Sequence, residues 1–181
     1  PILAETIRNL YDGVPMDEVY KASVLAARTM IEKDPDYTFA TARLLFYTIS
    51  KEVLGRVVVQ ADMAQAYIDY FPGFIKKGVE NDLLDERLGQ YDLPRLAASI
   101  KADRDLQFDY LGLQTLYDRY FLHVEKKRIE LPQAFFMRVA MGLALNEVDR
   151  EARAIEFYEV LSSFDFMSST PTLFNSGTLR S

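Results

Sequence analysis

The stretch from Leu131 to Leu143 reads LPQAFFMRVAMGL and carries a sharp helical pattern. Its apolar residues recur at positions i, i+3, i+4 and i+7, which puts them on one face of a helix. The residues of this stripe are Phe136, Val139, Ala140 and Leu143. The stretch therefore predicts an amphipathic helix that begins after Pro132.

A second helix is expected directly after this one. Asn146 is the expected N-cap, with Asp149 in the first turn, where a negative charge complements the helix dipole. The helix should end around Ser162 and Ser163. Its apolar stripe consists of Val148, Ala152, Ile155, Tyr158 and Leu161.

Two further helices are expected near the start of the chain. Apolar residues recur at helical spacing over residues 16–33 and again over 39–53, until Gly55 stops the second helix. Residues 34–36, Asp-Pro-Asp, form a short connection, so the two helices should be antiparallel neighbours. Their stripes are Tyr20, Val24, Ala27 and Ile31, then Phe39, Ala42, Phe46, Ile49 and Val53.

The middle of the chain predicts shorter elements. Residues 57–59 are three valines, too few for a clear strand, and we treat them as a connector before a helical run at 61–71. Weaker patterns predict short helices over 72–100, then an aromatic-rich helix at about 112–123. The charged residues 124–130 indicate an exposed loop or a small hairpin. Glycine and proline lie mostly between these segments, so we expect an all-α fold, an irregular multi-helix bundle ending in an extended loop.

Composition excludes several classes of function. The chain has 181 residues with a formal net charge of -6, which disfavours a nucleic-acid polymer as partner. It has no cysteine and a single histidine, His123, so neither thiolate chemistry nor a zinc site of its own is expected. No apolar run reaches the roughly 20 residues of a membrane helix. We therefore expect a soluble, cytoplasmic protein with no membrane partner and with neither a metal site nor a catalytic residue in this chain.

The tail from Ser168 to Ser181 differs in composition from the rest. Small, hydroxyl-bearing and turn-forming residues replace the helical pattern. Such a loop exposes backbone N–H groups and Ser/Thr oxygens, which suits an anion or a sugar-phosphate. The alternative is a flexible tail at the edge of a domain.

The run SSTPTLFNSGT at residues 168–178 resembles a segment of the large, catalytic subunit of class I ribonucleotide reductase. The resemblance extends to LPQAFFMRVA at 131–140 and to DRDLQFDY at 103–110, which look like the family's helical domain. Residues 11–13 and 36–44 resemble the C-terminal half of an ATP-cone, a regulatory nucleotide module. The cone's Val-x-Lys-Arg-Asp-Gly strand segment is absent.

The resemblance implies three regions and one site residue. Residues 1–55 would be half of an ATP-cone-like helical region, 56–165 the helical N-terminal domain, and 166–181 a substrate-phosphate loop leading into a catalytic barrel. The parent enzyme reduces ribonucleoside diphosphates by cysteine-radical chemistry, so this cysteine-free chain would be inactive alone and would contribute scaffold. Thr172 matches the family position that hydrogen-bonds the substrate phosphates, and a threonine hydroxyl offers one donor and two acceptor sites for that role.

The resemblance also implies partners and cofactors. No cofactor is expected in this chain. The parent enzyme takes its radical from a metal-containing small subunit and responds to ATP and deoxyribonucleotide effectors. Its reductant would be thioredoxin or glutaredoxin, and its large subunits would form a homodimer.

Other residues have simpler interpretations. Lys51 matches a lysine that the cone presents to effector phosphate, but a solvated lysine near a helix C-terminus is preferred because half of the cone is missing. His123 is expected to be an ordinary surface or half-buried residue. Asn175, Ser176 and Gly177 are expected to shape the loop, since a left-handed turn accepts Asn and Gly.

Two alternative functions remain open at this point. A stand-alone helical interaction module would have a well-ordered, compact C-terminus, whereas a reductase fragment should be extended or mobile after about Phe166. A nucleotide-binding regulatory domain active in isolation is the other alternative. The tyrosines Tyr110, Tyr117 and Tyr120 stand at helical spacing and are expected to be core residues.

Overall fold

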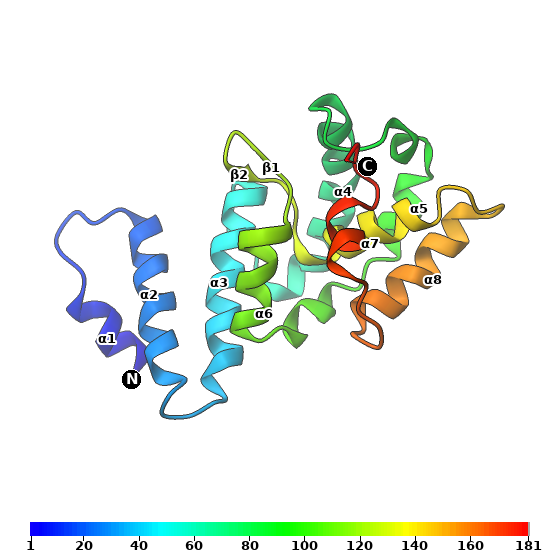
Figure 1. Cartoon of the computed structure of the whole chain (residues 1–181). Helices are drawn as coiled ribbons and strands as arrows, with labels where there is room; N and C mark the ends of the chain where they lie inside the picture. The colour runs from blue at the N-terminus through cyan, green and yellow to red at the C-terminus, as the bar shows by residue number, and fades with distance from the viewer. Residues whose placement is uncertain (181) are drawn as a thin grey trace.

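The computed structural model describes residues 1–180, which fold into helices and one short hairpin (Figure 1). The predicted all-α class is confirmed. The α-helices are α1 (Ile2–Arg8), α2 (Met16–Met30), α3 (Tyr37–Leu54), α4 (Met63–Glu80), α5 (Leu93–Ala98), α6 (Tyr110–Thr115), α7 (Pro132–Leu143), α8 (Arg150–Ser162) and α9 (Thr170–Asn175). The shorter helical turns are η1 (Gln60–Asp62), η2 (Glu86–Gln90), η3 (Ala102–Gln107) and η4 (Leu116–Tyr120), and the strands are β1 (His123–Val124) and β2 (Lys127–Arg128).

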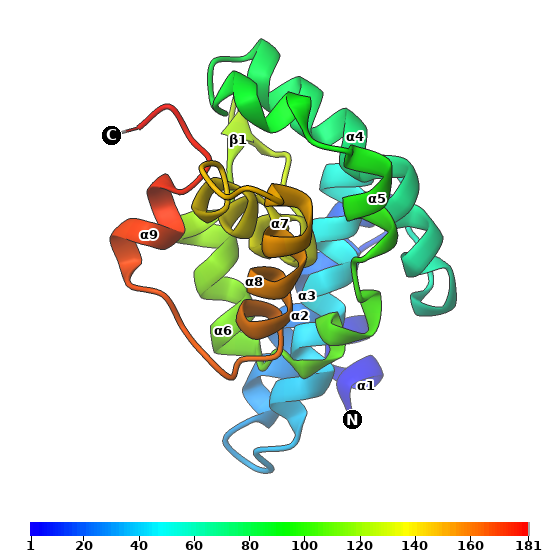
Figure 2. The ribbon, with the colours of Figure 1, turned by 90° about the vertical axis from the view of Figure 1, so that its right-hand side faces the viewer.

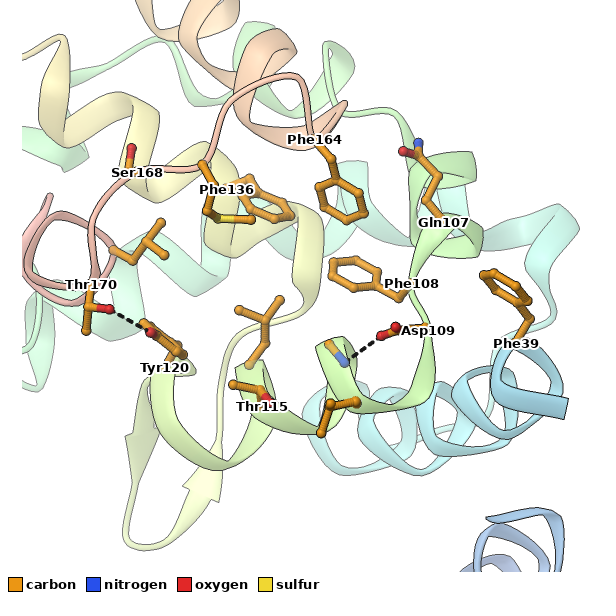
Figure 3. A pocket seen from close by; sticks show the side chains of 15 residues that line it. Phe39, Gln107, Phe108, Asp109, Thr115, Tyr120, Phe136, Phe164, Ser168 and Thr170 are labelled. Atoms are coloured by element: carbon orange, nitrogen blue, oxygen red, sulfur yellow. Dashed lines mark hydrogen bonds between the residues drawn. The ribbon is translucent and has the colours of Figure 1, made fainter. Parts of the chain in front are cut away.

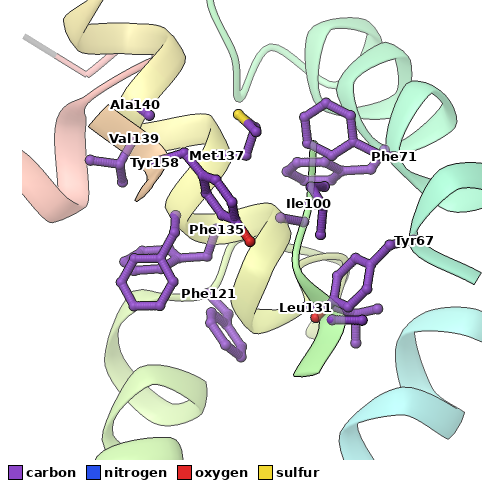
Figure 4. Packing of buried hydrophobic residues seen from close by; sticks show 14 of the residues in the cluster. Tyr67, Phe71, Ile100, Phe121, Leu131, Phe135, Met137, Val139, Ala140 and Tyr158 are labelled. Carbon is purple, nitrogen blue, oxygen red and sulfur yellow. The ribbon is translucent and has the colours of Figure 1, made fainter. Parts of the chain in front are cut away.

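Helix α7 lies in the middle of the core, and each of its residues from Pro132 to Met141 is buried (Figure 4). The buried surface of α7 is therefore wider than the predicted one-sided stripe. It also ends before Leu143, which the predicted stripe included but which is exposed. The reason is that α8, α9 and η3 all pack against α7. A helix that is covered on all sides needs apolar residues on all sides. The rings of Phe135 and Phe136 lie 5.3 Å apart and fill two of these faces.

Helices α2 and α3 form the expected antiparallel pair, with α1 against α2 (Figure 1). α2 ends at Met30 rather than at Lys33. α3 ends where predicted, because Gly55 adopts the left-handed conformation at φ 72° and its N–H donates to the Lys51 carbonyl at 2.9 Å.

Helix α4 continues through Pro72 to Glu80, so the prediction of separate short helices from Pro72 onward is wrong for this segment. A proline inside a helix removes one backbone hydrogen bond and costs about 3 kcal/mol or more. Phe71, Phe74 and Ile75 are buried on the same helix. Each such side chain contributes about 1.5–3 kcal/mol on burial, which offsets the cost of the proline.

The start of α8 also differs from the prediction. Asp149, rather than Asn146, is the N-cap, and its Oδ1 accepts a hydrogen bond from the Ala152 N–H at 3.2 Å. A carboxylate there complements the helix dipole as well as the backbone donor. Val148 is exposed outside the helix and does not belong to its stripe. The end at Ser162 is as predicted.

The aromatic-rich helix predicted at 112–123 is shorter than expected. α6 gives way to a π-turn, η4, in which the Phe121 N–H donates to the Leu116 carbonyl at 2.9 Å. The small hairpin predicted next is confirmed, with Val124 paired to Lys127. The three valines at 57–59 lie in no strand, as expected of a connector.

A buried hydrogen-bond network joins η3 to α4, α7 and α8. The Asp105 carboxyl accepts from the Tyr67 hydroxyl and from the Gln133 side-chain amide, each at 2.8 Å. The Gln133 side-chain oxygen accepts from the Tyr158 hydroxyl at 2.8 Å. Backbone N–H groups of Gln133 and Lys101 donate to these two tyrosines, so every bond is directed toward Asp105. Burial raises the pKa of Asp105 to about 7.

Candidate functional site

Thr172 lies in α9, the last helix, which packs beside α7 (Figure 2). Its side chain is half-buried, and its hydroxyl oxygen lies 3.2 Å from that of Ser169, the N-cap residue. The predicted extended loop is therefore wrong over residues 170–175, which are helical. Pro171 suits this helix because the first turn needs no intrahelical N–H bond from it.

The segment after α9 is packed against the domain, and the expectation that it would be extended or mobile is wrong. Thr178 forms a bridge with Leu84, and the Asp85 N–H donates to the Gly177 carbonyl at 3.0 Å. Gly177 adopts the left-handed conformation expected of it, at φ 76°. Asn175 instead ends α9 in a helical conformation. The segment folds compactly because its contacts lie within this chain.

A buried ion pair between Glu130 and Arg138 holds this segment. Both side chains have 0% exposure, and Arg138 Nε donates to Glu130 Oε1 at 2.7 Å. Arg138 Nη1 donates to the carbonyls of Leu173 at 3.2 Å and Ser176 at 2.9 Å. The Ser176 hydroxyl in turn donates to the Val139 carbonyl on α7 at 2.7 Å. The turn after Thr172 is thus fixed to α7 by a cation.

Tyr120 contacts α9 at both Phe174 and Thr170. Its ring stacks on Phe174 with centroids 4.5 Å apart, and its hydroxyl lies 3.2 Å from that of Thr170. Tyr120 also contacts Phe135 of α7, edge to face, at 6.2 Å. The aromatic spacing predicted a core residue, and Tyr120 is half-buried, but its role as a support for α9 was missed.

Gly142→Ala is expected to destabilise the protein by roughly 1–3 kcal/mol, as overpacking does. A methyl group at Gly142 would overlap the backbone nitrogen of Gly177 and the hydroxyl of Ser176. Urea unfolding of this chain measures the effect. Gly73→Ala is the matched control, because it is also a helical glycine and nothing lies near its added methyl group. If Gly142→Ala is as stable as Gly73→Ala, the close approach of the two segments is wrong.

A cavity of about 630 Å³ opens beside α9 (Figure 3). Its walls are mainly apolar, and the rings of Phe108 and Phe164 meet edge to face at 5.1 Å on one side. Ser168 and Thr170 bring hydroxyl groups to the wall, while Thr172 does not line the cavity. The cavity lies next to the candidate residue, but its lining suits apolar groups better than phosphate.

Lys51 occupies a separate hollow of about 400 Å³ between α2, α3 and the hairpin. Its ammonium lies 2.6 Å from Asp17 and over the Tyr20 ring, 5.2 Å from the centroid. The hydrogen bond to Lys51 lowers the pKa of Asp17. Lys51 is therefore paired within the chain. Lys21 and Lys127 also line this hollow.

The remaining candidates are dispersed. His123 is exposed on β1, as expected of an ordinary surface residue. Tyr117 is half-buried and donates from its hydroxyl to Glu52 at 2.7 Å, and burial raises its pKa to about 12. The Arg128 guanidinium lies over the Tyr117 ring, 4.4 Å from its centroid. The exposure predicted for residues 124–130 therefore holds for Lys126 but not for Arg128.

Residues 1–180 hold neither a metal-binding cluster nor a membrane-spanning helix. Among residues 1–180, no three acidic or histidine side chains gather as a metal site would require. Over the same residues, no helix combines the length and apolarity needed to cross a membrane.

Residues 106–181 match the family described as "Ribonucleotide reductase, all-alpha domain". The resemblance found in the sequence is confirmed.

The relatives are reductase subunits. The "Ribonucleoside-diphosphate reductase subunit alpha" of Chlamydia trachomatis is 49% identical over 173 residues, and that of Helicobacter pylori strain 26695 is 38% identical over 171. The "Ribonucleoside-diphosphate reductase large subunit" of Danio rerio is 32% identical over 179 residues. These matches cover 96%, 93% and 99% of this chain but 16%, 21% and 22% of the respective relatives. The chain thus spans about a sixth to a fifth of their length.

Proposed function

We propose that this chain is the helical part of a ribonucleoside-diphosphate reductase large subunit that presents Thr172 to the diphosphate of the substrate. The observation that carries the proposal is the placement of Thr172, a half-buried residue on a turn whose two ends are fixed. A hydroxyl held in this way donates to a phosphate oxygen without first being ordered by the ligand.

The proposal extends to the whole protein. A complete subunit would reduce ribonucleoside diphosphates by cysteine-radical chemistry, and its cysteines must lie outside this chain, which has none. Its radical would come from a metal-containing small subunit, its electrons from thioredoxin or glutaredoxin, and its large subunits would pair. Residues 1–55 would belong to a regulatory nucleotide module. The relatives named as reductase subunits match 96% and 99% of this chain, and these matches include residues of the 1–55 region. They support the proposal for the whole protein.

Thr172→Ala in the complete subunit is expected to raise the KM for a ribonucleoside diphosphate by roughly 10-fold to 150-fold. The reason is the loss of one hydrogen bond to a charged group, worth about 1.5–3 kcal/mol. Steady-state kinetics measure the effect. The melting temperature should stay nearly unchanged, because within residues 1–180 the Thr172 side chain hydrogen-bonds only to Ser169.

Two variants make this test specific. Thr172→Ser keeps the hydroxyl and should retain most of the affinity, whereas Thr29→Ala removes an exposed threonine of α2 and should change nothing. An unaltered KM and kcat in Thr172→Ala would refute the phosphate contact.

The compact C-terminus does not by itself favour the stand-alone interaction module. The module was expected to differ from a reductase fragment by a compact C-terminus, and the C-terminus is compact. However, Arg138 and Gly142 account for that packing within the domain itself. Compactness therefore does not distinguish the two functions, and the match to reductase relatives favours the enzyme.

A further inference from the structure

Arg138 is the one charged side chain in the apolar run of residues 134–143, and it is completely buried. Its guanidinium group donates hydrogen bonds to two different partners, a carboxylate and a pair of backbone carbonyls. Nε and Nη2 donate to the two oxygens of Glu130, at 2.7 and 3.1 Å. Nη1 donates to the carbonyls of Leu173 and Ser176, at 3.2 and 2.9 Å. The planar fork therefore joins a carboxylate on one edge to two backbone carbonyls on the other.

These two carbonyls lie at the C-terminal end of α9. The last carbonyls of a helix have no partner within the helix and carry its partial negative charge, so a cation there satisfies both needs. Glu130 neutralises that cation and also accepts from the Leu122 N–H at 3.1 Å. Each guanidinium nitrogen and each carboxylate oxygen has a hydrogen-bond partner, and each charge is retained only because the other is present.

Stability alone does not explain this arrangement. Well-packed apolar residues often replace a buried ion pair without loss of stability, so such a pair is better explained by the geometry that it imposes. Here the pair fixes the position of Thr172, because Arg138 holds the carbonyl of the next residue, Leu173. The Thr172 carbonyl itself accepts from the Ser176 N–H at 3.0 Å, and Ser176 is the other residue that Arg138 holds.

We propose that Arg138, oriented by Glu130, is a positioning residue for the substrate phosphate. It does not touch the phosphate but fixes the turn that carries Thr172. This inference rests on the proposed function of Thr172. It predicts that loss of the fork contacts impairs substrate binding even when the fold and the charge are preserved.

The test uses Arg138→Lys in the complete subunit, with Thr172→Ala measured alongside. Lysine keeps the positive charge beside Glu130 but has no planar fork to reach the two carbonyls. The expected result is a KM for the ribonucleoside diphosphate raised roughly tenfold with kcat within about twofold, because a binding group is misplaced and not removed. Arg56→Lys, an exposed arginine, is the matched control and should leave both constants unchanged.

Amide hydrogen exchange adds a readout at the segment itself. The N–H groups of Leu173, Ser176 and Thr178 are hydrogen-bonded within the terminal segment. In Arg138→Lys their exchange should speed up by roughly tenfold, as local opening becomes easier, while exchange in α2 and α3 stays the same. Equal acceleration throughout the chain would mean general destabilisation and would overturn the positioning role.

Ser176→Ala decides the question if Arg138→Lys does not fold. It removes only the hydroxyl contact to Val139, at the edge of the same turn. A KM raised about two- to threefold supports the proposal, and an unchanged KM overturns it.

Failure of this inference differs from failure of the proposed function. If Thr172→Ala raises the KM but neither Arg138→Lys nor Ser176→Ala does, the positioning role is wrong and the phosphate contact stands. If Thr172→Ala leaves the KM unchanged, the phosphate contact is wrong, and the positioning role is overturned with it.

Discussion

Glu130→Ala is expected to lower the free energy of unfolding by roughly 3–5 kcal/mol, because it leaves a buried charge without its partner. Arg138 would keep its guanidinium in the core with two donors unpaired, and the Leu122 N–H would lose its acceptor. The free energy of unfolding of a native protein is only about 5–15 kcal/mol, so this loss is a large share of it. Urea unfolding of this chain measures it.

Two controls show whether the effect comes from the unpaired charge. Glu147→Ala changes an exposed glutamate and should shift stability by less than about 0.5 kcal/mol. The double variant Glu130→Leu with Arg138→Met removes both charges and should recover part of the loss. If Glu130→Ala behaves like Glu147→Ala, the buried pair does not exist as described.

The stability of the protein is expected to fall as the pH rises from about 4 to about 7 because of Asp105. Its pKa is about 7 in the folded state and 3.8 as an isolated group, so in this window the folded state holds a proton that the unfolded state has released. The unfolded state therefore binds fewer protons, and raising the pH favours it. The loss is on the order of 2–4 kcal/mol between these limits and levels off above pH 7.

Asp105→Asn separates this group from the others that titrate. The variant cannot ionise, so the slope between pH 4 and 7 should disappear. At low pH both oxygens of the protonated carboxyl can still accept from Tyr67 and Gln133, whereas the amide nitrogen of the variant cannot accept. The variant should therefore lose one of these hydrogen bonds, at a cost of about 1–3 kcal/mol. Asp103→Asn, at an exposed neighbour, should keep the slope. A slope that survives in Asp105→Asn would disprove the assignment.

Periodicity was sufficient to predict the elements whose neighbours lie along one face. The α2–α3 pair and the stop at Gly55 follow from apolar spacing and a left-handed cap. Periodicity failed where long-range burial overrides a local signal. Pro72 reads as a break but lies within α4, because Phe71 and Ile75 are buried on either side of it.

The candidate site was predictable only in part. The resemblance of residues 168–178 to the reductase family singles out Thr172, but it does not single out the residues that hold it. Glu130 follows a basic turn and reads as solvated, although it is buried, and Arg138 reads as the polar face of an amphipathic helix. The one available signal was that Arg138 is the lone charge among the apolar residues 134–143. Asp105 gave no signal either, because it directly follows the charged residues Asp103 and Arg104.

A crystal structure of the complete large subunit with a bound ribonucleoside diphosphate would test the central claim most directly. We expect a phosphate oxygen within about 3 Å of the Thr172 hydroxyl, at hydrogen-bonding distance, with α9 still fixed by Arg138. A diphosphate bound elsewhere, with Thr172 facing only protein or solvent, would contradict the account.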